Sequence, residues 1–190
     1  LFDSPIERLV CTECVINSIE IDGDCIPLNL RELHLNHNEI NADGCRELAK
    51  LLQGGDSKLE KLDLDYNRID DEGVAILVDA LENNTSLRML HLEGNRGITA
   101  EGRKLLLKLV NDVSSIKATL NSNHRLQMVD VSYQNGAEIQ DQIITATYTN
   151  EVYGPDVERI AKAKVIYTQL QSAKREQLRR LQGVERANDT

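Results

Sequence analysis

Histidine and aspartate, two residues that can ligate a metal or exchange a proton, recur at a nearly constant spacing in this sequence. His34, Asp63 and His91 are 29 and 28 residues apart, and Asp130 follows 39 residues later. Side by side, imidazole and carboxylate groups could bind zinc, or they could form a pH-sensitive patch that receives basic side chains. They could also be ordinary solvated charges. The chemistry therefore depends on which elements of structure carry these residues.

The elements that carry them are copies of one sequence pattern. Each copy has leucine at its first, fourth and sixth positions and asparagine at its ninth, and the copies start at Leu30, Leu59 and Leu87. Six or seven residues after each asparagine, a glycine opens an apolar run at helical spacing. One strand and one helix in a period of 28 or 29 residues are typical of a leucine-rich repeat solenoid, whose units bury their apolar faces by stacking.

In each copy, both the strand pattern and the helical run recur at matching positions. A sequence with this combination resembles the ribonuclease-inhibitor class of leucine-rich repeat proteins, in which each repeat holds a full helix. The resemblance implies an α/β solenoid, a right-handed superhelix with a parallel sheet on its concave side and helices on its convex side. The sequence is also similar to uncharacterised leucine-rich repeat proteins of single-celled algae. They share a Ser-Asn-His linker before a strand, here residues 122–124, and an Ala-Lys-Val-Ile-x-x-Gln-Leu segment of a tail helix, here residues 163–170.

Weaker copies of the pattern flank the three good ones. The upstream copy begins at Ile6, only 24 residues before Leu30, so we expect it to lack a full helix. Downstream, one register begins at Ser115, and another begins at Leu126 and leaves room for an extra helical segment near residues 114–122. We favour the second, because the first puts Ser and Ala at core positions. The expected strands lie near residues 6–11, 30–35, 59–64, 87–92 and 126–131.

The end of the chain leaves the repeat. We expect the solenoid to occupy residues 1–135 and a helical tail to occupy residues 136–190, with a long helix near 155–182. Pro155 signals the start of that helix and Gly183 its end. The apolar stripe of the helix could pack on the last repeat, or the helix could project and bind a partner. Weak association of this basic helix with an anionic membrane is a lesser alternative.

Alternation along the strands predicts which side chains line the concave face. Residues between the inward leucines point into the groove, and matching residues of neighbouring strands stand about 4.8 Å apart. The histidines and aspartates named above then form one column of this face. The predicted partner-binding surface comprises His34, Asn36, His37, Lys61, Asp63, Asp65, Tyr66, Met89, His91, Glu93, Met128, Asp130 and Tyr133.

The repeat asparagines, Asn38, Asn67 and Asn95, are predicted to be structural rather than part of a binding site. At the bend that ends each strand, their amides can satisfy backbone groups that would otherwise be buried without partners. We expect Asn38→Ala to cost about 1 to 3 kcal/mol of stability for this reason.

No motif predicts catalysis, a cofactor or a metal centre. The sequence has no phosphate-binding glycine loop, nucleophile elbow or His-Glu-x-x-His segment. A parallel sheet would also spread the histidines and aspartates along a line rather than around a metal ion. The C-x-x-C motif of Cys11 and Cys14 is explained by the repeat register, since Cys11 replaces a leucine and Cys14 an asparagine. We therefore predict a protein that is not an enzyme.

Charge favours a protein partner with a basic surface. Residues 136–190 contain 8 Lys and Arg and 8 Asp and Glu, so the net charge of −9 belongs to residues 1–135. Such a surface repels nucleic acid, and a single Phe with no Trp leaves few platforms for base stacking. No apolar run reaches the roughly 18 residues of a membrane span. No targeting segment is visible, and we expect an intracellular protein.

These observations favour a non-catalytic protein–protein interaction module, expected to be part of a larger protein or a multi-subunit assembly. The resemblance to ribonuclease-inhibitor-like proteins implies one alternative, an enzyme regulator that inhibits its target or activates a small GTPase. Such activators carry arginine or asparagine at repeat edges, where Arg68 and Arg96 stand here, but nothing specific marks either residue. The other alternative is a purely architectural subunit that makes its contacts through its convex helices and tail.

Overall fold

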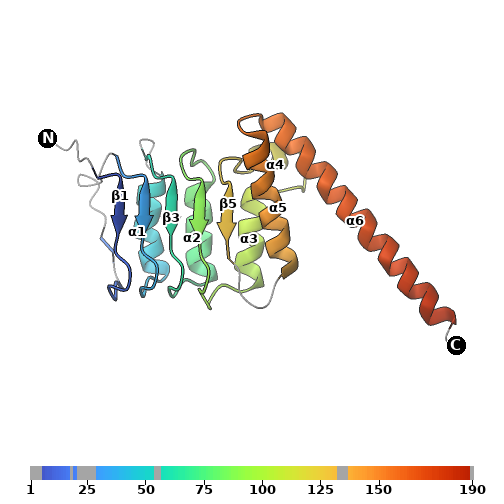
Figure 1. The fold of residues 1–190 in the computed structure, drawn as a ribbon, viewed down its shortest axis with the longest axis horizontal. Coiled ribbons are helices and arrows are strands. Elements are labelled where there is room, and N and C mark those ends of the chain that lie inside the picture. Colours follow the sequence, from blue (N-terminus) through green and yellow to red (C-terminus); the bar gives the residue numbers. More distant parts are fainter. Residues whose placement is uncertain (1–5, 18, 21–28, 54–56, 132–136, 189–190) are drawn as a thin grey trace.

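The computed structural model describes residues 6–17, 19–20, 29–53, 57–131 and 137–188. These residues form a solenoid with one sheet and one layer of helices, from which a long helical tail projects (Figure 1). The sheet is parallel, and its strands are hydrogen-bonded in chain order. The strands are β1 Arg8–Val10, β2 Glu32–His34, β3 Lys61–Asp63, β4 Met89–His91 and β5 Met128–Asp130.

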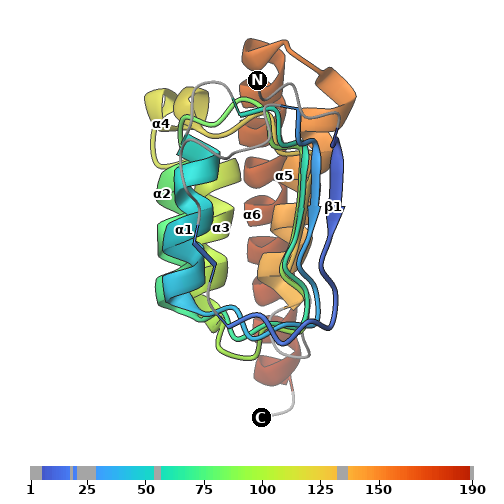
Figure 2. The same ribbon diagram turned by 90° about the vertical axis from the view of Figure 1, so that its left-hand side faces the viewer.

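Three helices cover one face of the sheet and leave the other face uncovered, as the end view in Figure 2 shows. Each follows a strand of a good repeat, and neighbouring helices contact one another. These helices are α1 Ala42–Gln53, α2 Asp71–Leu81 and α3 Ala100–Val110. The predicted α/β solenoid, with a parallel sheet on one side and helices on the other, is confirmed.

The repeated leucines form the core between the two layers. Leu33, Leu62 and Leu90 are paired in register across β2, β3 and β4, and Val129 of β5 extends the row. All four are buried, and Leu62 and Leu90 have no exposed surface. Because side chains alternate along a strand, burying this row turns the residues on either side of each leucine toward the uncovered face.

The segment after α3 has the second of the two registers that the sequence allowed. The extra helical segment is α4 (Ile116–Asn121), and Val129 of β5 pairs with Leu90 of β4. Ser115, which begins the other register, instead caps α4, and its hydroxyl accepts a hydrogen bond from the Ala118 N–H at 3.0 Å. A capping serine cannot also be a core residue of a strand.

At the other end of the sheet, β1 is an edge strand. Its central Leu9 is 40% exposed, whereas the equivalent Leu33 of β2 is 6% exposed. Among the described residues, β1 is hydrogen-bonded to β2 alone.

A helix that the sequence analysis did not separate from the tail, α5 (Ala137–Tyr153), closes the far end of the core. It contacts both β5 and α3 and buries Ile143 and Ala146. Ile144 and Tyr148, in contrast, are exposed on its outer side. Apolar residues therefore occur around the whole helix, and the usual one-sided pattern that marks a packed helix is weak.

The last helix, α6 (Val157–Asn188), both packs on the solenoid and projects from it (Figure 1). Its first turns bury Ile160, Ala161 and Lys164. The predicted end at Gly183 is wrong, because the helix continues to Asn188. One glycine inside a helix costs only about 1 kcal/mol, which good helix formers on both sides can offset. Among the described residues, no helix is apolar enough over a sufficient length to cross a membrane.

Candidate functional site

The uncovered face of the sheet, which we call the open face, gathers most of the predicted site residues. Strand pairing places His34 beside Asp63, Asp63 beside His91, and His91 beside Asp130. The fold thus brings into one column four residues that are far apart in the sequence. A second column contains Glu32, Lys61, Met89 and Met128 in the same pairing. Tyr133, also predicted here, lies outside the described residues.

Two carboxylates hold the imidazole of His34. Its Nδ1 lies 3.3 Å from Oδ2 of Asp63, and its Nε2 lies 3.2 Å from Oε2 of Glu32. The residue is only 7% exposed. The hydrogen bond to His34, together with the Arg8 guanidinium, lowers the pKa of the Glu32 carboxyl group. His34 is therefore a fixed part of the open face, and most of its capacity to bind a ligand is already used.

Negative charge concentrates beside this column at Asp65. Its Oδ1 accepts a hydrogen bond from the backbone N–H of Glu93 at 2.6 Å, and its own N–H donates to Oδ1 of Asp63 at 3.2 Å. Burial and the nearby Asp63 carboxylate raise the pKa of Asp65 to about 6. The open face therefore loses negative charge as the pH falls through about 6. At the matching position of the preceding repeat, Asn36 accepts a hydrogen bond from the Thr12 hydroxyl at 3.0 Å.

His91 and two methionines form a less polar part of the open face. Burial lowers the pKa of His91, and the positive charge of Lys61 lowers it further. Nε2 of His91 has no hydrogen-bond partner among the described residues. Met89 and Met128 are paired across β4 and β5 and are 39% and 46% exposed. A ligand that lies here meets apolar surface next to carboxylates.

The residues just before the repeat asparagines have a backbone conformation that the sequence analysis did not predict. His37, Tyr66 and Gly94 have φ of 56°, 53° and 73°, in the left-handed region. The ring of His37 stacks on that of Tyr66, with centroids 4.5 Å apart and planes inclined by 7°. Glycine at position 94 was the only sign of this conformation in the sequence, because glycine adopts it without a steric cost.

Gly94→Ala is expected to destabilise the protein by about 1 kcal/mol more than Gly154→Ala does. Both glycines have positive φ, so both alanines are strained. A Cβ at Gly94 would also run into the ring of Tyr66, whereas a Cβ at Gly154 meets no atom within 4 Å. Urea denaturation of the two variants measures the difference, and equal losses of stability would mean that the Tyr66 ring moves aside freely.

Comparison with protein-family models identifies the repeating unit. A family described as "Leucine Rich repeat" matches residues 28–49, 55–77 and 83–107. Each match begins just before a strand, β2, β3 or β4, and ends inside the helix that follows it. The repeats are leucine-rich repeats. The three matches coincide with the three segments in which the leucine and asparagine pattern is complete.

Curated proteins are similar to part of this chain. RAN GTPase-activating protein 2 of Arabidopsis thaliana is 25% identical over 124 residues, which cover 63% of this chain and 23% of that protein. Ran GTPase-activating protein of Drosophila melanogaster is 32% identical over 92 residues, 47% of this chain and 15% of that protein. The NACHT, LRR and PYD domains-containing protein 14 of Mus musculus is 39% identical over 97 residues, 50% and 10% of the two chains. The alignments thus span less than a quarter of each relative.

A solved structure has the same overall arrangement. Leiomodin-1 Actin-Binding Site 2 superimposes with a TM-score of 0.60 over 90% of this chain and 91% of that chain. The sequences are 14% identical, so the similarity concerns the fold.

The leucine-rich repeat asparagines lie at the strand-to-helix bends and bond backbone groups. Asn67 is typical: its Nδ2 donates to the carbonyl oxygens of Leu35 and Leu64 at 2.9 and 3.0 Å, and its Oδ1 accepts from the N–H of Ile40 at 3.0 Å. Asn38 and Asn95 make equivalent bonds in their own repeats. These contacts are those expected of structural residues rather than of a binding site.

A second set of buried asparagines, which the sequence analysis missed, lies on the opposite side of the leucine-rich repeats, in the segments that precede strands. Nδ2 of Asn84 donates to the Leu52 carbonyl at 2.8 Å, and Nδ2 of Asn123 donates to the Leu81 carbonyl at 2.8 Å. Their Oδ1 atoms accept from backbone N–H groups two and three residues later. The sequence contained a sign of this role, because Asn84 and Asn123 occupy matching positions in the loops that precede β4 and β5.

Metal binding receives no geometric support. Among the described residues, no group of three or more histidines, cysteines, aspartates or glutamates is placed to hold a metal ion. Cys11 and Cys14 are both unpaired, with Cys11 half-buried and Cys14 exposed. The N–H of Cys14 donates to Oδ1 of Asn38 at 3.0 Å, so the C-x-x-C segment is tied into the first bend of the repeats.

Proposed function

We propose that this chain is a protein-interaction module whose open face binds a basic segment of a partner protein. The observation that carries the proposal is the aligned column of Asp63 and Asp130 with histidines, next to Asp65 and the exposed methionines Met89 and Met128. Lysine and arginine have aliphatic stems and charged tips, so they can cover the methionines while they reach the carboxylates. The proposal extends the binding role that is general among leucine-rich repeats.

The triple variant Asp63→Lys, Asp65→Lys and Glu93→Lys is expected to lose binding of basic peptides by at least about tenfold. The three substitutions turn the most acidic part of the open face basic, so a lysine-rich or arginine-rich segment is repelled. The measurement is binding of the purified chain to an array of basic, neutral and acidic peptides, followed by titration of the strongest binder. A wild-type chain that shows no preference for the basic peptides would contradict the proposal.

A matched control reverses three acidic residues on the helical side, Glu72, Asp79 and Glu82, to lysine. All three are exposed and belong to α2 or its end, so the net charge changes by the same amount. Binding retained in this control and lost in the open-face variant supports the proposal. Equal losses in both variants would show only a general effect of net charge, and retained binding in both would favour contacts through the helices or tail.

The second candidate is a regulator of a small GTPase, favoured by the similarity to two Ran GTPase-activating proteins. Arg68 and Arg96 are exposed on the strand-to-helix turns, and Arg68 forms an ion pair with Glu39 at 2.6 Å. A GTPase whose hydrolysis is stimulated by the wild-type chain, and not by Arg68→Ala or Arg96→Ala, would favour this candidate. Stimulation that survives both substitutions would not involve an arginine of these turns.

A further inference from the structure

The C-x-x-C segment forms a turn at the end of the edge strand β1. Cys11 and Cys14 are the first and last residues of this turn, and both thiols are unpaired. The α-carbons at the two ends of such a turn lie less than about 7 Å apart. Cysteines more than about 7 Å apart cannot be bridged without movement of the backbone, and this turn keeps the pair below that limit.

Matching positions of another repeat show where the two side chains point. Cys11 occupies the position of Leu64, and like that leucine it packs against the core. Cys14 occupies the position of Asn67, whose side chain folds back over its turn to the carbonyl of Leu64, three residues earlier. The thiol of Cys14 folds back as well and donates to the Thr12 carbonyl at 3.3 Å. It therefore points toward the start of its own turn, where Cys11 lies.

Asn38 of the next repeat fixes the backbone on both sides of the pair. Its Nδ2 donates to the Cys11 carbonyl at 2.7 Å, and its Oδ1 accepts from the N–H groups of Cys14 and Ile16, both at 3.0 Å. Val15, between these two N–H groups, has φ of 56°, an outlier for a β-branched residue that persists only where the surroundings hold it. None of these contacts uses a sulfur atom, so a bond between the two sulfurs leaves them intact.

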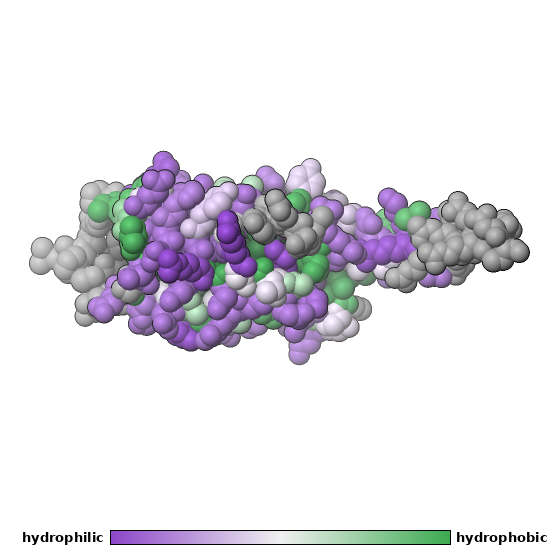
Figure 3. Space-filling model, turned by 90° about the horizontal axis from the view of Figure 1, so that it is seen from below, coloured by the Kyte–Doolittle hydropathy of each residue, from purple (hydrophilic) through white to green (hydrophobic). Residues whose placement is uncertain are grey.

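The thiols differ in how easily a reagent can reach them. Cys14 is exposed and Cys11 is half-buried. The surface that carries the strand-to-helix turns is mostly hydrophilic, as Figure 3 shows, so a small polar oxidant can approach it. Cys45, in contrast, has no exposed surface, and burial raises its pKa to about 12. An accessible thiol next to a protected one is the arrangement of an attacking and a resolving cysteine.

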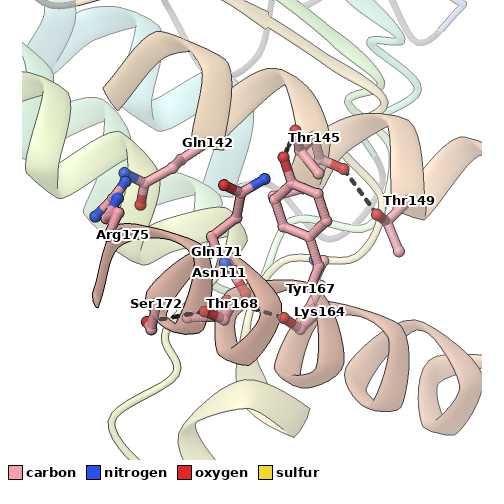
Figure 4. Close-up of a pocket in the computed structure, with 11 residues that line it drawn as sticks. Asn111, Gln142, Thr145, Thr149, Lys164, Tyr167, Thr168, Gln171, Ser172 and Arg175 are labelled. Carbon is pink, nitrogen blue, oxygen red and sulfur yellow. Dashed lines mark hydrogen bonds between the residues drawn. The ribbon is translucent and has the colours of Figure 1, made fainter. Parts of the chain in front are cut away.

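A small cavity at the other end of the solenoid offers no second site of this kind. It lies between α5 and α6, has a volume of about 40 Å³ and is lined mostly by polar side chains, as the close-up in Figure 4 shows. None of its lining residues is a cysteine. A cavity of this size holds only a few water molecules.

We propose that Cys11 and Cys14 are a reversible redox pair whose oxidant is a low-molecular-weight disulfide such as oxidised glutathione. The Cys14 thiolate attacks one sulfur of the oxidant, which forms a mixed disulfide and releases one thiol. The Cys11 thiolate then attacks the Cys14 sulfur, which forms the disulfide between the two cysteines and releases the second thiol. Two electrons pass from the protein to the oxidant, and the two cysteine protons end on the two released thiols.

The disulfide ties down the edge of the solenoid. Among the described residues β1 pairs with β2 alone, and its central Leu9 is 40% exposed. Repeats are stabilised by their neighbours, so an edge repeat opens more easily than a central one. A covalent link across its turn restricts the opened forms. The redox pair does not depend on partner binding at the open face, so either proposal can fail alone.

Peptide mapping of the native chain, after treatment with oxidised glutathione, tests the pairing. A protease that cleaves after glutamate cuts between the two cysteines and yields peptides 8–13 and 14–20, with Cys25 in another peptide. The first two peptides stay joined only by a disulfide between Cys11 and Cys14. We expect the joined pair to form with oxidised glutathione and to disappear with dithiothreitol. Absence of the joined pair, or a glutathione adduct on Cys14 that persists in its place, overturns the proposal.

A comparison with the urea-unfolded chain separates the effect of the fold from the general reactivity of the motif. Both samples carry Cys25→Ser, so that this thiol cannot compete. The measured quantity is the ratio of the Cys11–Cys14 disulfide to the glutathione adduct at one glutathione concentration. We expect this ratio to be at least about tenfold higher in the native chain, because the turn holds the two sulfurs together. A native ratio no higher than the unfolded one overturns the proposal.

Hydrogen exchange of residues 6–17 tests the effect on the edge of the solenoid. We expect backbone exchange to be at least about threefold slower in the oxidised chain than in the reduced chain. Cys14→Ser keeps a hydroxyl in place of the thiol and cannot form the disulfide, so its exchange is expected not to respond to the oxidant. Equal exchange in the oxidised and reduced wild type overturns the role of the pair in holding the edge.

Discussion

Lys164→Met is expected to stabilise the protein by about 1 to 3 kcal/mol at neutral pH. Lys164 is 2% exposed, and its Nζ donates to the Val110 carbonyl at 2.5 Å and lies 3.2 Å from Nδ1 of His124. Burial lowers the pKa of Lys164 from 10.5 to about 7, which corresponds to a penalty of about 5 kcal/mol on the charged form. Methionine removes this penalty and keeps most of the volume, but it leaves the Val110 carbonyl without its donor.

The same substitution is expected to flatten the dependence of stability on pH. Between the folded pKa of about 7 and the unfolded value, the unfolded chain binds more protons at Lys164 than the folded chain does. The free energy of unfolding of the wild type should therefore rise by about 2 kcal/mol from about pH 7 to about pH 9. Below pH 7 both states are protonated and the penalty is complete.

Urea denaturation followed by circular dichroism, at several pH values, measures both effects of Lys164→Met. Lys108→Met, at an exposed position of α3, is the matched control and should change neither the stability nor its pH dependence appreciably. A wild-type stability that is constant from about pH 7 to pH 9 would show that Lys164 is solvated or paired in solution. The same slope in Lys164→Met and the wild type would assign the effect to another group.

Asn67→Ala is expected to destabilise the protein by about 3 kcal/mol. Asn67 is 8% exposed and bonds the backbone of two repeats, through the carbonyls of Leu35 and Leu64 and the N–H of Ile40. Alanine leaves these buried groups without their partner. Because each repeat is stabilised by its neighbours, a loss at a central repeat weakens the stacking on both sides.

The control for this prediction is Asn36→Ala, expected to cost less than about 1 kcal/mol. Asn36 has the same side chain as Asn67, but it lies on the open face, where its Oδ1 accepts a hydrogen bond from the Thr12 hydroxyl. Thermal or urea unfolding of both variants provides the comparison. Similar costs for Asn67→Ala and Asn36→Ala would mean that the backbone at the bend finds other partners or water.

The spacing of leucines was sufficient to predict the solenoid and the columns of the open face. Leu33, Leu62 and Leu90 each sit at the centre of a strand, and their burial fixes which neighbours point outward. The prediction that His34 and Asp63 would lie side by side needed only this alternation and the repeat length.

Several features could not be read from the pattern, because they depend on contacts between distant segments. His37 and Tyr66 have positive φ at bends that pack against one another, although only a few per cent of residues other than glycine adopt this conformation. The separate helix α5 carries apolar residues both toward the core and away from it, so its pattern alone did not locate it.

The sequence by itself determined the repeat, the parallel sheet, the structural asparagines and the position of most charged residues on the open face. These follow from local periodicity, since a strand or helix with a regular apolar pattern has only one face that it can bury. Only the tertiary structure decided that Lys164 is buried against a carbonyl 54 residues earlier, and that α5 and α6 enclose a small cavity lined mostly by polar residues. Such arrangements depend on which distant surfaces meet at the end of the solenoid, where the repeat no longer dictates the neighbours.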